Sequence, residues 1–186
     1  YPGRPRRARR MGIRDGSPEW SANGRAAFGV GYGACLAGGR ALVAMNHVGV
    51  NVAADPLFTS VYSGVRAGLV VITADDPEMH SSQNEQDNRN YAIAAKMPMF
   101  EPSDSQDARD HVKWAFDLSE EFDTPVFVRT TTRLSHSKSL LDEAVSLASP
   151  RREPTVELGF DSDPAKYVMI PGHAKRRRVV LEERLE

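Results

Sequence analysis

What this sequence lacks excludes several classes of protein. Among its 186 residues there is one cysteine, Cys35, which excludes an internal disulfide or a cysteine-ligated iron–sulfur cluster within the chain. No stretch reaches the roughly 18 consecutive apolar residues that cross a bilayer, and no signal-peptide pattern opens the chain. A formal net charge of -1 favours neither nucleic acid nor a membrane surface as a partner. We therefore expect a cytoplasmic protein that binds neither.

Recognised catalytic motifs are missing as well. The chain has no nucleophile elbow, no Walker loop and no zinc-ligand spacing, and His80 with its acidic neighbours does not form a known metal pattern. Gly29, Gly31 and Gly33 fall inside a predicted helix rather than after a strand, so they are not a dinucleotide fingerprint. We interpret these glycines as allowing close helix packing, and we expect no metal site in the chain.

The two ends of the chain differ in composition from its middle. Residues 1–20 form an arginine- and proline-rich segment, which is typical of a solvated, irregular region, with anion or nucleic-acid binding as rival interpretations. Residues 21–137 are predicted to form the α/β domain, and residues 138–186 an irregular linker with a truncated C-terminal helix. The opening YPG resembles a turn entered from a preceding strand, so we expect the chain to be a piece of a longer protein.

The middle of the chain alternates helices with short apolar runs. A helix is predicted over residues 22–37, ended by Gly38 and Gly39, and another from Ser103 or Asp104 to about Phe122. Strands are predicted at 41–45, 68–77, between 96 and 101, and at 124–132. Because these runs do not alternate polar with apolar residues, they predict a mainly parallel sheet covered on both faces, in a three-layer α/β/α fold.

Polar clusters follow each predicted strand. After the first, Gly49 permits a tight turn or a close backbone approach, and either Asn46 or Asn51 is suited to cap a helix starting near Val52. The stretch from 75 to 89 is either a solvated loop or a site, and 101–105 is a helix entry rich in capping groups. The segment 129–137 is either an anion site or a twisted strand end. Since strands of a parallel sheet end at one edge, we expect 46–51 and 80–89 to converge on a crevice there.

The order of these clusters resembles the 2-oxoacid:ferredoxin oxidoreductases, specifically indolepyruvate:ferredoxin oxidoreductase alpha subunits. The matching stretches are YPG…EWS at 1–21, NHVGVNVAADPL at 46–57, TADDPEMHSSQNEQDNRNYA at 73–92, EPSDSQDA at 101–108, PVFVRTTTRLSHS at 125–137 and DPAKYVMIPGHAKRRRVVLEERLE at 163–186. The resemblance covers nearly the whole chain, and the stretch at 73–92 is its most specific part.

The resemblance implies the pyrimidine-binding domain of a thiamine-diphosphate enzyme. It implies oxidative decarboxylation of arylpyruvates to aryl-acyl-coenzyme A with ferredoxin as acceptor. It also implies Mg²⁺ and diphosphate held by a domain outside this chain, 4Fe-4S clusters elsewhere in the full-length subunit, a beta subunit and an oligomeric assembly. Cofactors of this kind carry the difficult chemistry, while the protein binds and orients them.

The sequence departs from the family pattern at one key position. The family's activating glutamate falls where this chain has Gly24, so a degenerate, non-catalytic interaction domain is the alternative interpretation. Asn46 stands where the family has a lysine. The residues that match family positions at strand ends are predicted to face cofactor or substrate: His47 and His80 as catalytic candidates, and Asn51, Ser81, Gln83, Asn84, Glu85 and Arg89 as cofactor-binding candidates.

Overall fold

The computed structural model describes residues 18–141 and 156–185. Four strands form one parallel sheet in the order β1-β2-β4-β3, so the predicted parallel sheet is confirmed. The strands are β1 (Ala41–Asn46), β2 (Leu69–Asp75), β3 (Met99–Phe100) and β4 (Val126–Thr131). Each lies within or next to a predicted apolar run.

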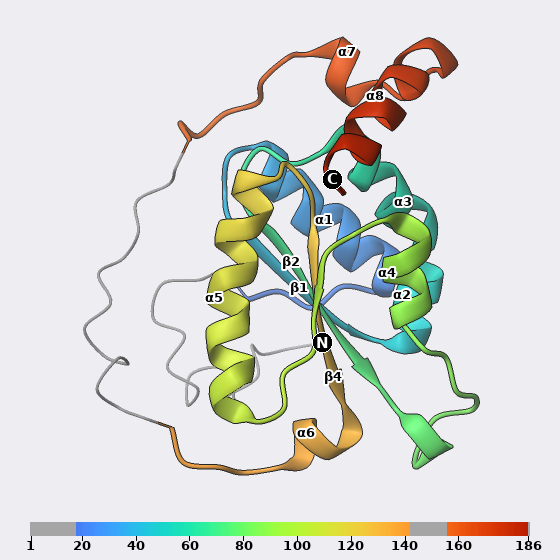
Figure 1. Ribbon diagram of the computed structural model, residues 1–186, viewed down its shortest axis with the longest axis vertical. Helices are drawn as coiled ribbons and strands as arrows, with labels where there is room; N and C mark the ends of the chain where they lie inside the picture. Colours follow the sequence, from blue (N-terminus) through green and yellow to red (C-terminus); the bar gives the residue numbers. More distant parts are fainter. Residues whose placement is uncertain (1–17, 142–155, 186) are drawn as a thin grey trace.

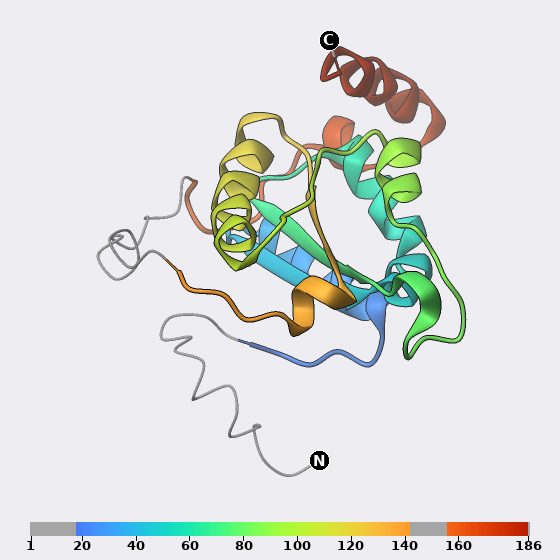
Figure 2. The same cartoon turned by 60° about the horizontal axis from the view of Figure 1, so that its bottom comes forward.

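Helices cover the two faces of the sheet and complete the predicted three layers (Figure 1). Figure 2 shows α5 (yellow) on one side, with α3 (teal) and α4 (light green) on the other. Neighbouring residues of a strand point to opposite faces, so Val71 and Phe127 join one apolar core while Val70 and Val126 join a second with Ala115 of α5. The helices of these layers are α1 (Gly24–Leu36), α2 (His47–Val52), α3 (Ala54–Ser63), α4 (Arg89–Ala95) and α5 (Ser105–Glu121).

Side-chain caps fix where the two long helices begin. The Asn23 side chain accepts a hydrogen bond from the amide of Ala26 at 2.9 Å, so α1 starts at Gly24, two residues later than predicted. The Asp104 carboxylate accepts from the amide of Asp107 at 2.9 Å, which confirms one of the two predicted starts of α5.

The glycines inside α1 do not all have the packing role predicted for them. A side chain on Gly31 would collide with Val43 of β1, so this glycine does allow α1 to lie close to the sheet. Gly29 and Gly33 have open space around them, and for these two the packing interpretation is wrong.

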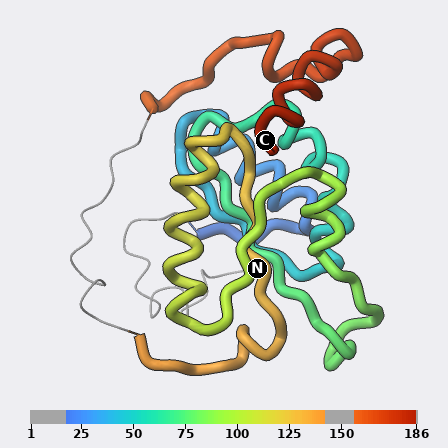
Figure 3. Tube along the Cα trace, in the orientation of Figure 1, coloured from blue at the N-terminus to red at the C-terminus, as the bar shows by residue number. Residues whose placement is uncertain are grey.

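The described C-terminal residues return to the body of the domain. They contain α7 (Pro164–Tyr167) and α8 (Pro171–Glu183), and α8 lies against α3 with Leu181 buried in the larger core. Figure 3 shows this red segment at the opposite end of the molecule from the green loop that follows β2. Within residues 18–141 and 156–185, no helix has the length and apolar character needed to cross a membrane.

The sheet therefore has two chemically distinct edges. We call the edge where the strands end the carboxyl edge; it carries the residues that follow Asn46, Asp75, Phe100 and Thr131. We call the opposite edge, which α7 and α8 approach, the amino edge. Polar residues that follow different parallel strands meet at the carboxyl edge, as the strand-end clusters predicted.

Candidate functional site

His47 is the buried centre of the first polar cluster. It is the first residue of α2, a short helix that was not predicted, and the helix predicted to start near Val52 is α3, which begins at Ala54. Asn46 is the residue that caps α2, because its side-chain oxygen accepts from the amide of Gly49 at 2.8 Å. Asn51 lies exposed on the same short helix. Of the two capping candidates, the structure selects Asn46.

The predicted convergence of residues 46–51 and 80–89 is confirmed by a direct contact. The Nε2 atom of His47 lies 3.0 Å from the backbone oxygen of Asn84, although the His47 side chain is 0% exposed. A carbonyl oxygen can accept but not donate, so Nε2 must carry the proton in this contact. Nδ1 is buried and has no hydrogen-bond partner among the described residues.

Asp75, at the end of β2, organises a buried polar network beneath this contact. One of its oxygens accepts from the backbone amide of Asn88 at 3.0 Å, and the other from the Asn88 side-chain amide at 2.7 Å. The same side-chain amide of Asn88 also contacts the Thr73 hydroxyl. Asp75 is 2% exposed, and Thr73 and Asn88 are 0% exposed. The network therefore fixes the residue that precedes α4.

Arg129 of β4 supplies the positive charge of this network. Its Nε donates to Asp75 at 2.6 Å, its Nη1 pairs with Glu101, and its Nη2 lies 3.8 Å from Asp87. The sequence left open that the segment from 129 to 137 holds an anion. For Arg129, three carboxylates of the protein already surround the guanidinium. After β4 the chain forms α6 (Thr132–His136) rather than continuing as a strand.

Asp76 holds the first half of the polar loop. Its carboxylate accepts from the amides of Ser81 at 2.9 Å and Ser82 at 3.0 Å, and from the Thr132 hydroxyl at 2.7 Å. These bonds, led by the Ser81 amide, hold the pKa of Asp76 well below its usual range. Within the loop, the short helix η2 (Pro77–Met79) contains Glu78 and Met79 with φ values of 66° and 53°. Strained backbone of this kind clusters at functional sites.

Most of the remaining predicted residues lie exposed around this loop. His80 is exposed, as are Ser81, Gln83, Asn84 and Glu85. The Glu85 carboxylate accepts from the amide of Glu78 at 3.0 Å, which closes the loop on itself. Arg89 donates from Nη2 to Asp87 at 2.7 Å, and this hydrogen bond lowers the pKa of the Asp87 carboxyl. The structure thus brings the loop residues and His47 to one edge.

Sequence reasoning missed the residues that hold this edge together. Thr73, Asn88 and Arg129 were not predicted as a set, although their network with Asp75 fixes the residue that precedes α4. The available signal was an arginine in an otherwise apolar strand, which must find a carboxylate when it is buried.

Position 24 has no room for a side chain. A Cβ atom on Gly24 would lie 2.8 Å from the carbonyl carbon of Gly49 and 2.9 Å from its Cα atom. Gly49 thus serves the close backbone approach predicted for it, with Gly24 as its partner. The first turns of α1 and α2 approach each other through their main chains at the position where the resemblance led us to expect the activating glutamate.

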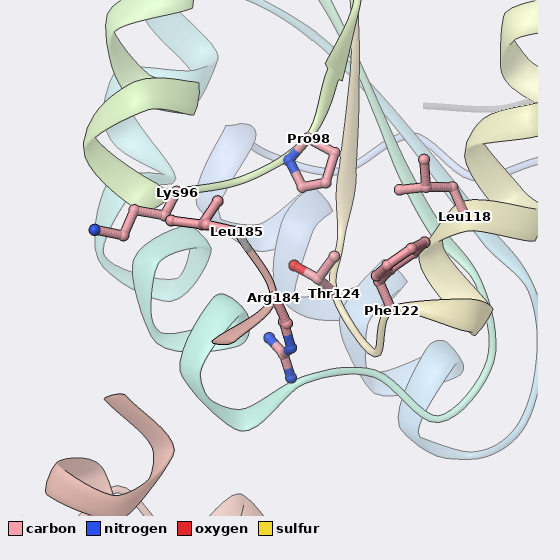
Figure 4. Close-up of a pocket in the computed structure, with 7 residues that line it drawn as sticks. All are labelled: Lys96, Pro98, Leu118, Phe122, Thr124, Arg184 and Leu185. Atoms are coloured by element: carbon pink, nitrogen blue, oxygen red, sulfur yellow. The ribbon is translucent and has the colours of Figure 1, made fainter. Parts of the chain in front are cut away.

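A cavity of about 170 Å³ lies at the other edge (Figure 4). Its walls include Pro98, Leu118 and Phe122, and Lys96 and Arg184 lie at its rim. Lys96 pairs with Glu182, and Arg184 with Asp123, so both cations already have carboxylate partners. This cavity contains none of the predicted site residues. Among residues 18–141 and 156–185, no three His, Cys, Asp or Glu side chains are grouped to hold a metal ion.

Comparisons with known proteins agree with the geometry. Residues 23–169 match the family described as pyruvate flavodoxin/ferredoxin oxidoreductase, thiamine-diphosphate-binding. The chain is 50% identical over 168 residues to the indolepyruvate oxidoreductase subunit IorA of Archaeoglobus fulgidus, covering 90% of this chain and 26% of that protein.

Two further relatives carry the same name. Identity is 47% over 157 residues to the protein of Methanothermobacter thermautotrophicus, covering 84% of this chain and 25% of that protein. Identity to the protein of Thermococcus kodakarensis is 43% over 171 residues, covering 90% of this chain and 26% of that protein. The chain therefore spans about a quarter of the length of the curated relatives that it matches.

Proposed function

Because this chain belongs to the thiamine-diphosphate-binding family of pyruvate flavodoxin/ferredoxin oxidoreductases, we propose that its carboxyl edge forms the pyrimidine half of a thiamine-diphosphate site. The enzyme we propose for it oxidatively decarboxylates arylpyruvates such as indolepyruvate, as the names of its relatives suggest. The observation that carries this proposal is the contact between His47 and Asn84, which joins two predicted site segments at one edge of the sheet.

The residues at this edge suit an aminopyrimidine. That ring presents an amino group that donates hydrogen bonds and ring nitrogens that accept them. The edge offers matching exposed groups of both kinds: the hydroxyl of Ser81, the amides of Gln83 and Asn84, and the carboxylate of Glu85. Bound thiamine diphosphate supplies a carbon nucleophile and a sink for the electrons that decarboxylation leaves behind.

The same edge does not suit the diphosphate. Carboxylates dominate the loop and the neighbouring strand ends: Asp75, Asp76, Glu78, Glu85, Asp87 and Glu101. A diphosphate placed here would be repelled unless a metal ion neutralised it, and no metal-ligand group occurs within the described ranges. We therefore assign the diphosphate and its Mg²⁺ to a domain outside this chain.

The protein's own part in the reaction would be to bind and orient. His47, held by Asn84, fixes the position of α2 relative to the loop. Arg89 is about half exposed, and its guanidinium lies where it could pair with the carboxylate of a 2-oxo acid. The 4Fe-4S clusters, coenzyme A, ferredoxin, a beta subunit, an oligomeric assembly and a cytoplasmic location all belong to this proposal.

A titration monitored by nuclear magnetic resonance tests the half-site directly. Thiamine diphosphate with Mg²⁺ is added to the full chain labelled with ¹⁵N, and amide shifts are followed. We expect weak binding that moves the amides of residues 46–51 and 80–89. Thiamine, which lacks the diphosphate, should move the same amides, since the pyrimidine is the part that binds. Shifts confined to the cavity near Phe122 would contradict the proposal.

The alternative of a non-catalytic domain is favoured by one observation, the contact between Gly24 and Gly49. A chimera distinguishes the two proposals: this chain replaces the matching quarter of the Archaeoglobus fulgidus relative. Indolepyruvate-dependent reduction of a viologen dye supports catalysis. A chimera that binds thiamine diphosphate but reduces no dye supports the interaction domain. Gly24→Glu is a poor probe here, because its side chain would overlap the backbone of Gly49.

A further inference from the structure

We propose that Arg129 is a positioning residue that holds His47 in a single tautomer, acting through Asp75, Asn88 and the loop that ends at α4. This inference rests on the proposed function only in treating His47 as part of the site. It assigns a role to a buried ion pair that does not itself lie among the exposed loop residues.

The first step is the clamp on Asn88. Asp75 binds both the backbone amide and the side-chain amide of this residue, at 3.0 and 2.7 Å. A carboxylate that accepts two bonds from one residue fixes both the position and the orientation of that residue. Since Asn88 is 0% exposed, water cannot take over either bond without the loop moving.

The second step is the dependence of this clamp on Arg129. Asp75 is 2% exposed, and a carboxylate buried to that extent destabilises the fold unless a cation lies beside it. Arg129 Nε lies 2.6 Å from the same Asp75 oxygen that accepts from the Asn88 amide. Without the guanidinium, Asp75 would be buried without its cation, and the carboxylate that clamps Asn88 would lose the contact that holds it in place.

The third step carries the restraint from Asn88 to His47. Three residues separate Asn88 from Asn84, and a bond of 2.9 Å from the Gln86 side-chain amide to the Asn84 side-chain oxygen spans part of that segment. The Asn84 backbone oxygen then accepts from His47 Nε2 at 3.0 Å. Arg129 also contacts Asp87 and Glu101, so the guanidinium ties this loop to the residue that follows β3.

The consequence for His47 is a fixed tautomer. While Asn84 holds its place, Nε2 carries the proton and Nδ1 is left with a free lone pair or, in the imidazolium form, a second proton. If the loop moves, nothing in the described surroundings favours Nε2 over Nδ1 as the protonated atom, because Nδ1 has no partner there.

The test compares His47 in variants of the full chain, with ¹⁵N-labelled histidine and long-range proton–nitrogen spectra recorded above the histidine pKa. The wild-type chain should show one protonated nitrogen, Nε2, and one unprotonated nitrogen, Nδ1. Arg129→Met should move both nitrogen signals of His47 toward each other, as expected for two exchanging tautomers. Arg129→Lys keeps a positive charge next to Asp75 and should restore most of the wild-type pattern.

Asn88→Ala is the second variant, in case Arg129→Met does not fold. It leaves the ion pair between Asp75 and Arg129 intact and removes the side-chain bond of the clamp, while the backbone amide of residue 88 can still donate to Asp75. It should produce partial averaging at His47. The matched control is Arg177→Met, which removes a largely buried arginine from an ion pair at the amino edge and should leave His47 unchanged. A folded Arg129→Met or Asn88→Ala variant with the wild-type His47 pattern would overturn the proposal.

Activity of the chimera separates this inference from the proposed function. If the chimera is active, Arg129→Lys should reduce kcat less than Asn88→Ala, for which we expect a loss of about 10²-fold, the size typical of a misplaced site group. If the chimera is inactive while His47 responds as described, the proposed function fails and the positioning role stands. If activity falls while the His47 spectrum stays constant, the positioning role fails and the proposed function stands.

Discussion

Two carboxylates, one at each edge of the sheet, have opposite surroundings. At the carboxyl edge, Asp75 is one of three carboxylates around a single guanidinium, that of Arg129. At the amino edge, Asp123 is a single carboxylate that binds three cations, Lys166, Arg177 and Arg184, at 2.9–3.1 Å. The Asp75 and Arg129 side chains are nearly excluded from water, at 2% and 7% exposed, whereas the Asp123 side chain is 32% exposed.

The two networks also join different parts of the chain. The cations around Asp123 come from the C-terminal segment and donate as well to backbone oxygens in the last turn of α3 and just after it. Arg184 Nη1 bonds to Val61 at 2.9 Å and Arg177 Nε to Tyr62 at 2.6 Å. They therefore cap a helix end while attaching α7 and α8 to the domain. Burial lowers the pKa of Arg184, so removing this charge from water opposes its attraction to Asp123.

This comparison indicates that the burial of each network, and the segments it joins, determine how large and how widespread the effect of changing it should be. The buried network holds the site loop against the sheet, and a change to it should lower the free energy of unfolding of the whole domain. The partly exposed network around Asp123 attaches α7 and α8 to the domain, and its charged groups contact both water and backbone oxygens. A change to that network should be smaller and more local.

Arg129→Met should have the largest effect of any single change to the two networks. It leaves Asp75 buried without a cation, and breaking a buried pair in this way costs about 3–5 kcal/mol. Urea denaturation of the variant should show that loss in the free energy of unfolding. A loss below about 1 kcal/mol would mean that the two edges are energetically alike, and the comparison would fail.

One glycine at each edge lies too close to its neighbours to carry a side chain, and replacing either should have the next largest effect on stability. Gly64→Ala adds a Cβ against the Asp123 carboxylate at a position with φ 77° and ψ -168°, a conformation that is nearly exclusive to glycine. Gly24→Ala forces a Cβ against the backbone of Gly49. We expect each to lower the free energy of unfolding by about 1–3 kcal/mol.

Gly33→Ala is the matched control for both glycine variants. This glycine lies within α1 and has nothing within 4 Å of an added Cβ atom. The variant should gain about 0.5–1 kcal/mol, because alanine favours a helix over glycine. Thermal unfolding of the three variants provides the measurement. Equal losses in all three would show that close contact at the edges is not what distinguishes Gly24 and Gly64.

Asp123→Asn should have a smaller and more local effect. Asparagine tolerates the left-handed backbone of this residue, whose φ is 52°, and can still accept from the amide of Val65. Removing the charge should cost about 1–2 kcal/mol. Hydrogen exchange should speed up in α7 and α8 while the sheet stays protected. Faster exchange throughout β2 and β4 would contradict the division between the two edges.

Acid should release the site loop by titrating Asp76, the mildest of the expected effects. Because its folded pKa lies below the usual value, its contribution is complete above pH 4 or so and is lost as pH falls through the lower folded pKa. Exchange at the amides of Ser81 and Ser82 should accelerate as pH is lowered through that range, after correction for intrinsic exchange rates. In the Asp76→Asn variant, the amides of Ser81 and Ser82 should exchange faster at neutral pH as well. Asp104→Asn is the control and should leave their exchange unchanged.

Several features of the fold could be predicted from local sequence. The apolar runs at residues 41–45 and 68–77 indicated parallel strands because they lacked alternation, and β2 is buried almost throughout. In β1, however, buried and exposed residues alternate, so the lack of alternation in the sequence did not show that one of its faces is exposed. Asp104 was one of two capping candidates, with Ser103, because a capping side chain acts within three residues of its own position, and the structure selects Asp104. The helix predicted to start near Val52 corresponds to α3, which begins at Ala54, but the short helix α2 that precedes it from His47 was not predicted.

The interactions that build the site could not be predicted in the same way. Asp75 and Arg129 are 54 positions apart, and their pairing depends on β2 and β4 being neighbours in the sheet. The main-chain contact of Gly24 with Gly49 depends equally on how α1 crosses α2. Neither has a local pattern that would reveal it.

The sequence by itself determined the parallel α/β layers, the edge at which polar groups gather, and the family pattern that those groups follow. These features depend on hydrophobic periodicity and on short-range caps, which act between residues close in the chain. Only the tertiary structure decided that Asp75 holds Asn88, that His47 meets Asn84, and that Asp123 attaches the C-terminal helices. Those contacts join residues far apart in sequence, so they exist only once the strands have been ordered.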